Sequence, residues 1–404
     1  MKIGLLAYHS ACNFGANLQL LSTIQFFKNK GFEPIVINWI PENLASSYSK
    51  SIPSIQQKVH LSFREKHYNE SVLCRTSKDV ANFLQKEQIS VVVIGSDAVA
   101  QHHPFLSRIG FPSRRIISFN TYTDDRMFPN VFWGDFIKYL DRKVTLIVMS
   151  ASCQNSAYTL FSSDLKERMY KAISNYSYLS VRDDWTQKMY ANISCGKIIP
   201  PVTPDPVFAF NYNVDFVPTK EDIMQKYGLP DKYILFSFLN EHTVTLKWLE
   251  SMNTLAHNDG YTTVALPFPK GILFNNFLDI QINIPLDPLD WYALIKYSSG
   301  YVGHNMHPIV VALHNSVPFY SFDNYGVVKF GFLVKEHSSK IYHILSKAGF
   351  LNNRTCARTI FNKMPKASEV YDRIKSFDKD NCSKFAHDYH QLYETMMDSI
   401  ISKF

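Results

Sequence analysis

Glycine and paired cysteine are scarce in this sequence of 404 residues, and each shortage excludes a class of protein. Only 15 residues are glycine, which excludes a collagen-like chain, and 46% are hydrophobic, which excludes a disordered one. The six cysteines contain no CxxC pair, so a zinc knuckle, a thioredoxin-like motif and a disulfide framework lack support. We expect a folded protein with reduced, mostly buried thiols.

Long apolar runs and dense basic runs are also missing. No stretch approaches the roughly 18 apolar residues of a membrane span, and residues 1–8 lack the apolar segment of a secretory signal. We therefore expect a cytoplasmic protein, free or at the inner face of the membrane, with at most peripheral membrane contact. Lys and Arg number 42 against 35 Asp and Glu, a mild excess that favours anionic substrates. Arg114 and Arg115 are typical of a solvated loop, so we expect no nucleic-acid partner.

Short apolar runs alternate with helical patterns along the chain. The run 2–7 precedes a polar loop and apolar residues at helical spacing over 18–27, before Gly31 ends the helix. Further strands are predicted at 34–39, 90–94, 144–149, 178–181, 233–238, 261–266 and 318–322. Further helices are predicted near 79–86, 165–174 and 291–297, with another ending at about 257. This alternation predicts an α/β fold with two mostly parallel, doubly wound sheets.

Prolines clustered over 200–206 mark the predicted boundary between two domains, because prolines cannot donate to a sheet ladder and stiffen a connector. We predict an N-terminal domain over 1–205, a C-terminal domain over 206–382 and a last helix over 383–404 that packs on the body. Near 100–142 the periodicity fails, which predicts an insertion that could serve as a lid. Two such domains leave a cleft between the carboxyl ends of their strands, where open α/β sheets bind ligands.

The loop after the first strand, YHSACNFGANLQ (8–19), is the first candidate site. It places Asn13, Gly15, Asn17 and Gln19 at a helix start, where backbone N–H groups can receive an anion. The loop is neither a GxGxxG motif nor a P-loop. A purely structural interpretation is equally open, in which Asn13 caps the helix and Gly15 permits a tight turn.

Two further candidates also follow apolar strands. Ser96 and Asp97, after Gly95, place a carboxylate where it could hold a substrate hydroxyl or accept its proton, although a helix N-cap is the rival interpretation. His304 and His307 open an apolar helix, where a histidine can donate to a phosphate or carboxylate. Their HxxH spacing offers no third ligand, so we expect no metal.

Several stretches together resemble the polysaccharide pyruvyl transferase family: KIGLLAYHSACNFGANLQLLSTIQFFKNKGFEPIVINW, VVVIGSDAV, YLSVRDDWT, TPDPVF and DPLDWYALIKYSSGYVGHNMHPIVVALHNSVPF. They occur in the family's order and span most of the chain. The resemblance implies two Rossmann-like domains in a glycosyltransferase-B-like (GT-B-like) arrangement, without a cofactor. It also implies transfer of pyruvate from phosphoenolpyruvate to two hydroxyls of a sugar as a cyclic ketal. The acceptor would be a galactose-type glycan, free or lipid-linked, that is a precursor of a capsule or exopolysaccharide.

The same resemblance implies roles for individual residues. His307 corresponds to the family's late histidine and would act as the acid. Asp97 corresponds to its GSD aspartate, as base or hydroxyl anchor, and Arg182 to its SVR arginine. The remaining candidate substrate-binding residues are Asn13, Gly15, Asn17, Gln19, Ser96, His304 and Asn305.

One position departs from the family pattern. Many members carry an arginine where this chain has Asn305, so an anchor for phosphate or carboxylate is missing. Lys329, which matches a lysine of some members, or an arginine of the insertion (Arg108, Arg114 or Arg115) would supply the charge. Two other functions stay open: a sugar-nucleotide-dependent glycosyltransferase and a non-catalytic glycan-binding relative.

Overall fold

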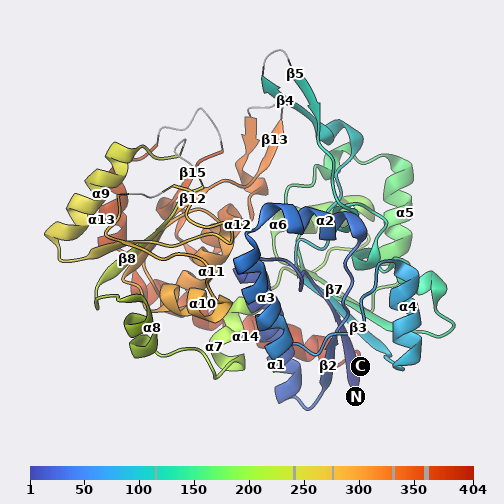
Figure 1. Ribbon diagram of the computed structural model, residues 1–404. Helices are drawn as coiled ribbons and strands as arrows, with labels where there is room; N and C mark the ends of the chain where they lie inside the picture. The colour runs from blue at the N-terminus through green and yellow to red at the C-terminus, as the bar shows by residue number, and fades with distance from the viewer. Residues whose placement is uncertain (114–115, 240–242, 275–276, 330–332, 359–363) are drawn as a thin grey trace.

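Two parallel β-sheets lie side by side in the computed structural model, which describes residues 1–113, 116–239, 243–274, 277–329, 333–358 and 364–404 (Figure 1). The first sheet has the strand order β2-β1-β3-β6-β7, and neighbouring strands pair in parallel. Its strands are β1 (Lys2–Leu6), β2 (Glu33–Val36), β3 (Val91–Asp97), β6 (Thr145–Ala151) and β7 (Tyr178–Val181). The surrounding helices include α1 (Phe14–Asn29), α4 (Ser77–Lys86), α5 (Ser163–Ile173) and α6 (Asp184–Ile193).

The second sheet has the order β10-β9-β8-β11-β12-β15, again parallel throughout. Its strands are β8 (Tyr233–Ser237), β9 (Thr262–Ala265), β10 (Ile280–Gln281), β11 (Gly300–Gly303), β12 (Phe319–Asp323) and β15 (Arg354–Cys356). Its helices include α8 (Lys220–Tyr227), α9 (Leu246–Asn258), α10 (Pro288–Lys296), α11 (Met306–His314), α12 (Lys340–Ala348) and α13 (Ala367–Lys375). The predicted α/β class with two doubly wound sheets is therefore confirmed.

Strand order determines where a ligand can bind. In the first sheet the chain reverses direction across the sheet between β1 and β3, and in the second between β8 and β11. Doubly wound sheets bind their ligands outside the carboxyl ends of the strands at such a switch point. The segments after β1, β3, β8 and β11 are therefore the expected walls of a site.

Local sequence explains several element boundaries. The run VVVI of 91–94 is buried on both faces of β3, as expected for a central parallel strand. Asn13 caps α1 through its side chain, which accepts a hydrogen bond from the N–H of Ala16 at 3.2 Å. Thr76 and Asp79 form a capping box that starts α4. These caps satisfy N–H groups that a helix leaves without partners at its start.

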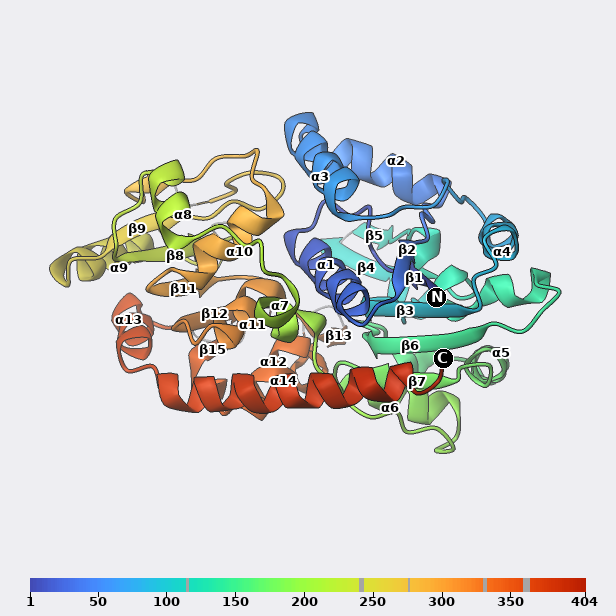
Figure 2. The same cartoon turned by 90° about the horizontal axis from the view of Figure 1, so that it is seen from below.

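The two halves share an extensive interface. One hydrophobic core runs through both sheets, from Ile3 in β1 to Ile400 in the last helix. Gln56 of α3 (Ser54–His67) is fully buried and exchanges two 2.8 Å hydrogen bonds with the backbone of Leu286 in the second half. Figure 2 shows α14 (Lys379–Ile401) running beneath both halves, so that the C-terminus lies beside the first sheet. Phe404 there contacts Phe27 of α1.

Several predictions of local structure need correction. Residues 42–67 form two helices, α2 (Glu42–Ser51) and α3, where no element was expected. The last helix begins at Lys379 rather than at residue 383, and α11 begins at Met306, after His304. In the insertion, β4 (Ile109–Ser113) and β5 (Ile116–Phe119) pair as a hairpin that projects at the top of Figure 1. The domain boundaries at 205 and 382 and the lid stay predictions.

Candidate functional site

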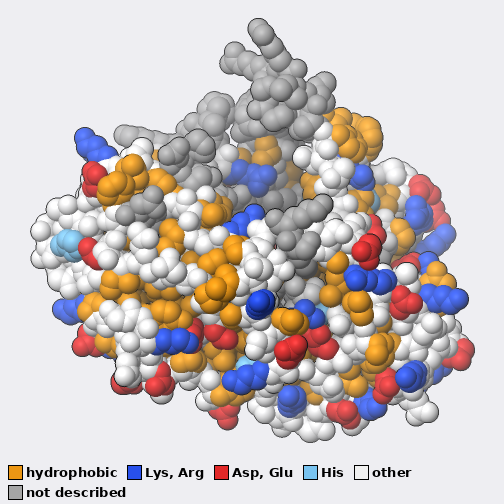
Figure 3. Space-filling model, in the orientation of Figure 1, with side chains coloured by type: hydrophobic (Ala, Val, Ile, Leu, Met, Phe, Trp, Pro, Cys, Tyr) orange, Lys and Arg blue, Asp and Glu red, His pale blue; other side chains and the backbone are white. Residues whose placement is uncertain are grey.

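A cavity of about 410 Å³ opens at the junction of the two switch points. The first half contributes the loop after β1 and the end of β3, and the second half contributes the ends of β8 and β11 and the start of α12. The side chains that carry the following argument are Asn13, Gly15, Asp97, Asn305, His307, Tyr325 and Lys340. On the face drawn in Figure 3, Lys and Arg side chains lie along the middle of the molecule, between its two halves. The cavity is thus built by both sheets.

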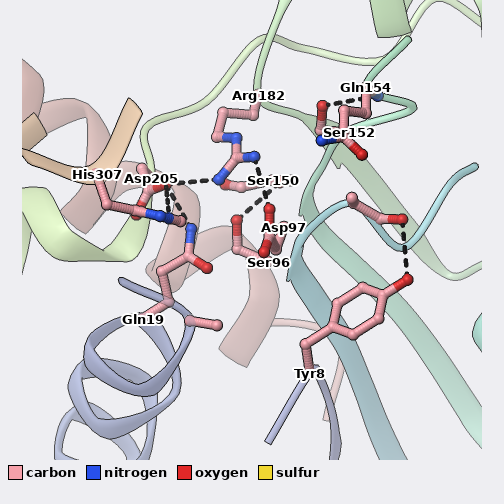
Figure 4. A network of polar contacts seen from close by, with 12 residues as sticks. Tyr8, Gln19, Ser96, Asp97, Ser150, Ser152, Gln154, Arg182, Asp205 and His307 are labelled. Atoms are coloured by element: carbon pink, nitrogen blue, oxygen red, sulfur yellow. Dashed lines mark hydrogen bonds and ion pairs between the residues drawn. The ribbon is translucent and has the colours of Figure 1, made fainter. Parts of the chain in front are cut away.

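Arg182 holds two carboxylates of the first half together. Its guanidinium, 3% exposed, donates to Asp205 Oδ2 at 2.7 Å and to Asp97 Oδ1 at 3.0 Å (Figure 4). Burial opposes ionisation of Asp97, but the nearby charges of Arg182 and Lys340 outweigh it and hold the pKa of this carboxyl well below its usual value. Asp97 is therefore a carboxylate at neutral pH, with little tendency to take up a proton.

His307 reaches the cavity because the opposite helix has no side chain there. A Cβ built on Gly15 would lie 1.9 Å from His307 Cγ, which is a severe overlap. Gly15 lies inside α1 rather than in a turn, so the tight-turn interpretation is wrong and close approach is the reason for the glycine. The contact joins the first turn of α1 to the first turn of α11.

The imidazole of His307 is buried and lacks a hydrogen-bond partner for Nε2 among the described residues. That nitrogen faces Asp205 Oδ2 at 4.0 Å, beyond hydrogen-bond distance. Burial lowers the pKa of His307 to about 4, although Asp205 and Asp97 act in the opposite direction. The ring is neutral at pH 7 in the free protein, and an arriving anion would favour its protonation.

Lys340 is a second buried basic side chain that the second half brings to the cavity. It is 6% exposed, and its Nζ lies 4.5 Å from the centre of the Tyr325 ring. Burial lowers the pKa of Lys340 to about 8, with Arg182 acting in the same direction and Asp97 against it. The ammonium form still predominates at neutral pH.

The structure brings some of the predicted site residues to the cavity and places others behind it. Asn13, Gly15, Asp97, Asn305 and His307 line the cavity. Residues with their polar groups engaged elsewhere are Asn17, bonded to Tyr68 and His60; Gln19, bonded to Asp205; Ser96, bonded to the carbonyl of Ser150; and His304, bonded to Leu239 and Thr243. Because these polar groups are already bonded, the geometry does not favour direct substrate contact by these four residues. No helix follows Asp97, so the N-cap interpretation there is wrong.

None of the residues that were expected to replace the missing arginine is placed in the cavity by the described residues. Lys329 ends β13 (Val327–Lys329), but its side chain lies outside the described residues, as do Arg114 and Arg115. Arg108 donates to the carbonyl of His103 and does not line the cavity. Asn305 lines it with a φ of 75°, without a side-chain hydrogen bond to the start of α11.

Asp205 and Lys340 are among the site residues that the sequence did not single out. Asp205 lies within the TPDPVF stretch, and an aspartate before proline in a predicted connector was the only signal available. Lys340 starts a short amphipathic helix like many others, and nothing in the local sequence marks it. Over the described residues, no group of three or more His, Cys, Asp or Glu side chains could hold a metal ion.

Solved structures with the same architecture place this chain in a fold class. A UDP-GlcNAc 2-epimerase from Neisseria meningitidis, bound to UDP-GlcNAc, is 10% identical with a TM-score of 0.55, covering 100% of this chain and 99% of that chain. A UDP-GlcNAc 2-epimerase from Methanocaldococcus jannaschii is 10% identical with a TM-score of 0.56, covering 97% of this chain and 100% of that chain. A ugt transferase from Siraitia grosvenorii in complex with UDP is 10% identical with a TM-score of 0.51, covering 100% and 99%. The protein has a GT-B-like fold of two Rossmann-like units.

The family follows from the sequence itself. The family model described as polysaccharide pyruvyl transferase matches residues 13–325, which is most of the chain. The chain belongs to the polysaccharide pyruvyl transferase family. A comparison with curated proteins gave no match. Over the described residues, no helix combines the length and apolar character that a membrane span needs.

Proposed function

We propose that this protein transfers pyruvate from phosphoenolpyruvate to two hydroxyls of one sugar residue, forming a cyclic ketal on a galactose-type precursor of a cell-surface polysaccharide. The observation that carries the proposal is His307. It is a buried imidazole whose Nε2 has no hydrogen-bond partner among the described residues, at the start of a helix and in the wall of a cavity shared by both sheets. Family membership supplies the reaction class, and this geometry supplies a proton carrier where a reacting atom can approach.

The reaction can be written so that atoms and charges balance. Protonated His307 gives its proton to the methylene carbon of phosphoenolpyruvate, and the neighbouring carbon becomes electron-poor. A sugar hydroxyl adds to that carbon and loses its proton. The bond from the carbon to the phosphate oxygen breaks, and phosphate leaves with the bonding pair. The second hydroxyl then closes the ketal and releases the second proton. One of the two hydroxyl protons restores the proton that His307 delivered, and the other leaves with the phosphate as hydrogen phosphate.

The geometry favours one of the two roles considered for Asp97. Since Arg182 holds its pKa far below neutral, Asp97 is a weak base and a good hydrogen-bond acceptor. We infer that it orients an acceptor hydroxyl rather than removing its proton. Gly15 serves the same reaction by leaving room for the His307 ring.

The test is turnover with phosphoenolpyruvate and a panel of galactose-type acceptors, both free and lipid-linked. Phosphate release and a mass gain of one pyruvate ketal are followed in the same sample. His307→Gln should lower turnover by about 100-fold or more while leaving the fold intact. His387→Gln, on the exposed face of α14, is the matched control and should behave as wild type. Near-normal turnover by His307→Gln would show that His307 is not the acid.

The same samples distinguish the alternative functions. The structural relatives that bind UDP or UDP-GlcNAc make a sugar-nucleotide-dependent glycosyltransferase the nearest alternative. Thermal stabilisation by a nucleoside diphosphate, with none by phosphoenolpyruvate, would favour that activity. Acceptor binding without phosphate release from any donor would favour a non-catalytic glycan-binding role.

A further inference from the structure

Lys340 is a buried cation without an anionic partner in contact. Its Nζ forms neither a hydrogen bond nor an ion pair with any residue in the described ranges, and it lies 4.5 Å from the centre of the Tyr325 ring. Other buried cations of this region differ, since Arg182 contacts two carboxylates and Arg354 contacts two more. A buried charge that is left unpaired is costly, so its retention at a cavity wall indicates a ligand that supplies the missing counter-charge.

The surrounding structure fixes Lys340 in this place. Ser339 caps α12, and its Oγ donates to Asp323 Oδ2 at 2.6 Å. The other oxygen of Asp323 accepts the N–H of Tyr325 at 2.8 Å, so one buried carboxylate positions both Tyr325 and the residue before Lys340. Arg354 in β15 donates to the same carboxylate at 2.7 Å. The lysine is thus held by a rigid network at the end of β12 rather than by a surface loop.

The charges that face Lys340 come from both halves of the molecule. They are Asp97, Asp183 and Asp205, which favour its ammonium form, and Arg182 and His307, which oppose it, beside the phenol of Tyr325. Asp97 and Asp205 are already paired with Arg182, and Asp183 is bonded to Ser152 and Thr186. Because these carboxylates already bond to other residues, an incoming oxyanion could contact Lys340 without displacing a partner.

We propose that Lys340 binds an oxyanion of the donor. This inference rests on the proposed use of phosphoenolpyruvate. Both its phosphate and its carboxylate have the required chemistry, and each can accept a charge-assisted hydrogen bond from an ammonium group. His307 and Lys340 then contact the donor from neighbouring helices, α11 and α12, of the same half. The donor site belongs to the second half of the molecule, and the acceptor meets it from the side of Asp97.

The experiment measures binding of phosphoenolpyruvate, phosphate and pyruvate by calorimetry to the wild-type protein, Lys340→Met and Lys347→Met. Lys347 lies in the same helix and is exposed, which makes it the matched control. Lys340→Met should weaken phosphoenolpyruvate binding by about 30-fold or more. A parallel loss for phosphate, but not for pyruvate, would place the phosphate on Lys340, and the reverse would place the carboxylate there.

A second measurement uses only the wild-type protein and does not depend on how the variant folds. Phosphoenolpyruvate affinity should fall by about tenfold between pH 7 and pH 9, because Lys340 with a pKa of about 8 loses its charge over that interval. The fall should be absent in Lys340→Met. Wild-type protein that neither binds nor turns over phosphoenolpyruvate would overturn the proposed function itself. Wild-type turnover together with unchanged affinity in Lys340→Met would overturn only the role of Lys340.

Discussion

The two walls of the cavity differ in how their ionisable side chains are paired. On the side of the first half, Asp97 and Asp205 are joined by Arg182 at 3.0 and 2.7 Å. On the side of the second half, His307 and Lys340 have no hydrogen-bonded partner among the described residues. The paired wall is a fixed scaffold in which one buried guanidinium joins two carboxylates. The unpaired wall keeps a proton carrier and a cation available for a ligand.

The strongest disturbance of the paired wall is Arg182→Met. We expect the free energy of unfolding to fall by about 3–5 kcal/mol, because the buried Asp205 and the part-buried Asp97 would lose their cationic partner. Denaturant titration measures this loss. The control Arg373→Met, at an exposed position of α13, should change stability by less than about 0.5 kcal/mol. Equal losses in the two variants would contradict the idea that Arg182 holds this scaffold together.

The next effect tests whether the two walls form one unit. Gln56→Ala removes both hydrogen bonds to the buried backbone of Leu286 and should lower the free energy of unfolding by about 2–3 kcal/mol. Because the two halves share a core, unfolding should remain a single transition. The control is Lys58→Ala, two residues away on the exposed face of α3. Separate transitions for the halves would show that the shared core does not couple them.

Gly15→Ala tests the close contact between the two walls, where Gly15 meets the ring of His307. The new Cβ would overlap the His307 ring, so the ring or the helix must shift. We expect a stability loss of about 1–3 kcal/mol and, from a displacement of about 1 Å, a loss of turnover of about 100-fold. Combining it with His307→Gly removes the ring and should recover most of the lost stability. Wild-type turnover in Gly15→Ala would show that the ring has room to move.

The last effect, which is the smallest when counted per pH unit, is a pH dependence carried by the unpaired wall. His307 has a pKa of about 4 in the folded protein and about 6.5 when unfolded, so between these values the unfolded chain binds more protons. Its contribution to stability is complete above pH 6.5 and falls as the pH decreases toward 4, by at most about 1.4 kcal/mol per pH unit. Unfolding measured from pH 7 to pH 4.5 should show a shallower slope for His307→Gln than for wild type. Identical slopes would contradict the lowered pKa.

Residue patterns predicted the fold more completely than the site. The apolar runs of β1, β3 and β8 and the helical spacing of α1 were readable because burial of a parallel strand and of a helix face leaves a local signature. Helices α2 and α3 were missed because their polar sequences carry little of that signature, and α3 is held in place by contacts such as Gln56 with Leu286. Among the site residues, His307 and Asp97 were found because each follows a strand end.

By itself the sequence determined the α/β class, the capping of α1 by Asn13 and the family, since these depend on residues close together in the chain or on a pattern spread along it. Only the tertiary structure decided which charges are paired. Arg182, Asp97 and Asp205 come from separate segments, and so do Gly15 and His307. Burial and electrostatic balance depend on what surrounds a side chain in space. For that reason the sequence did not mark Lys340. Among the described residues that line the cavity, it is the one buried cation without a hydrogen bond or an ion pair.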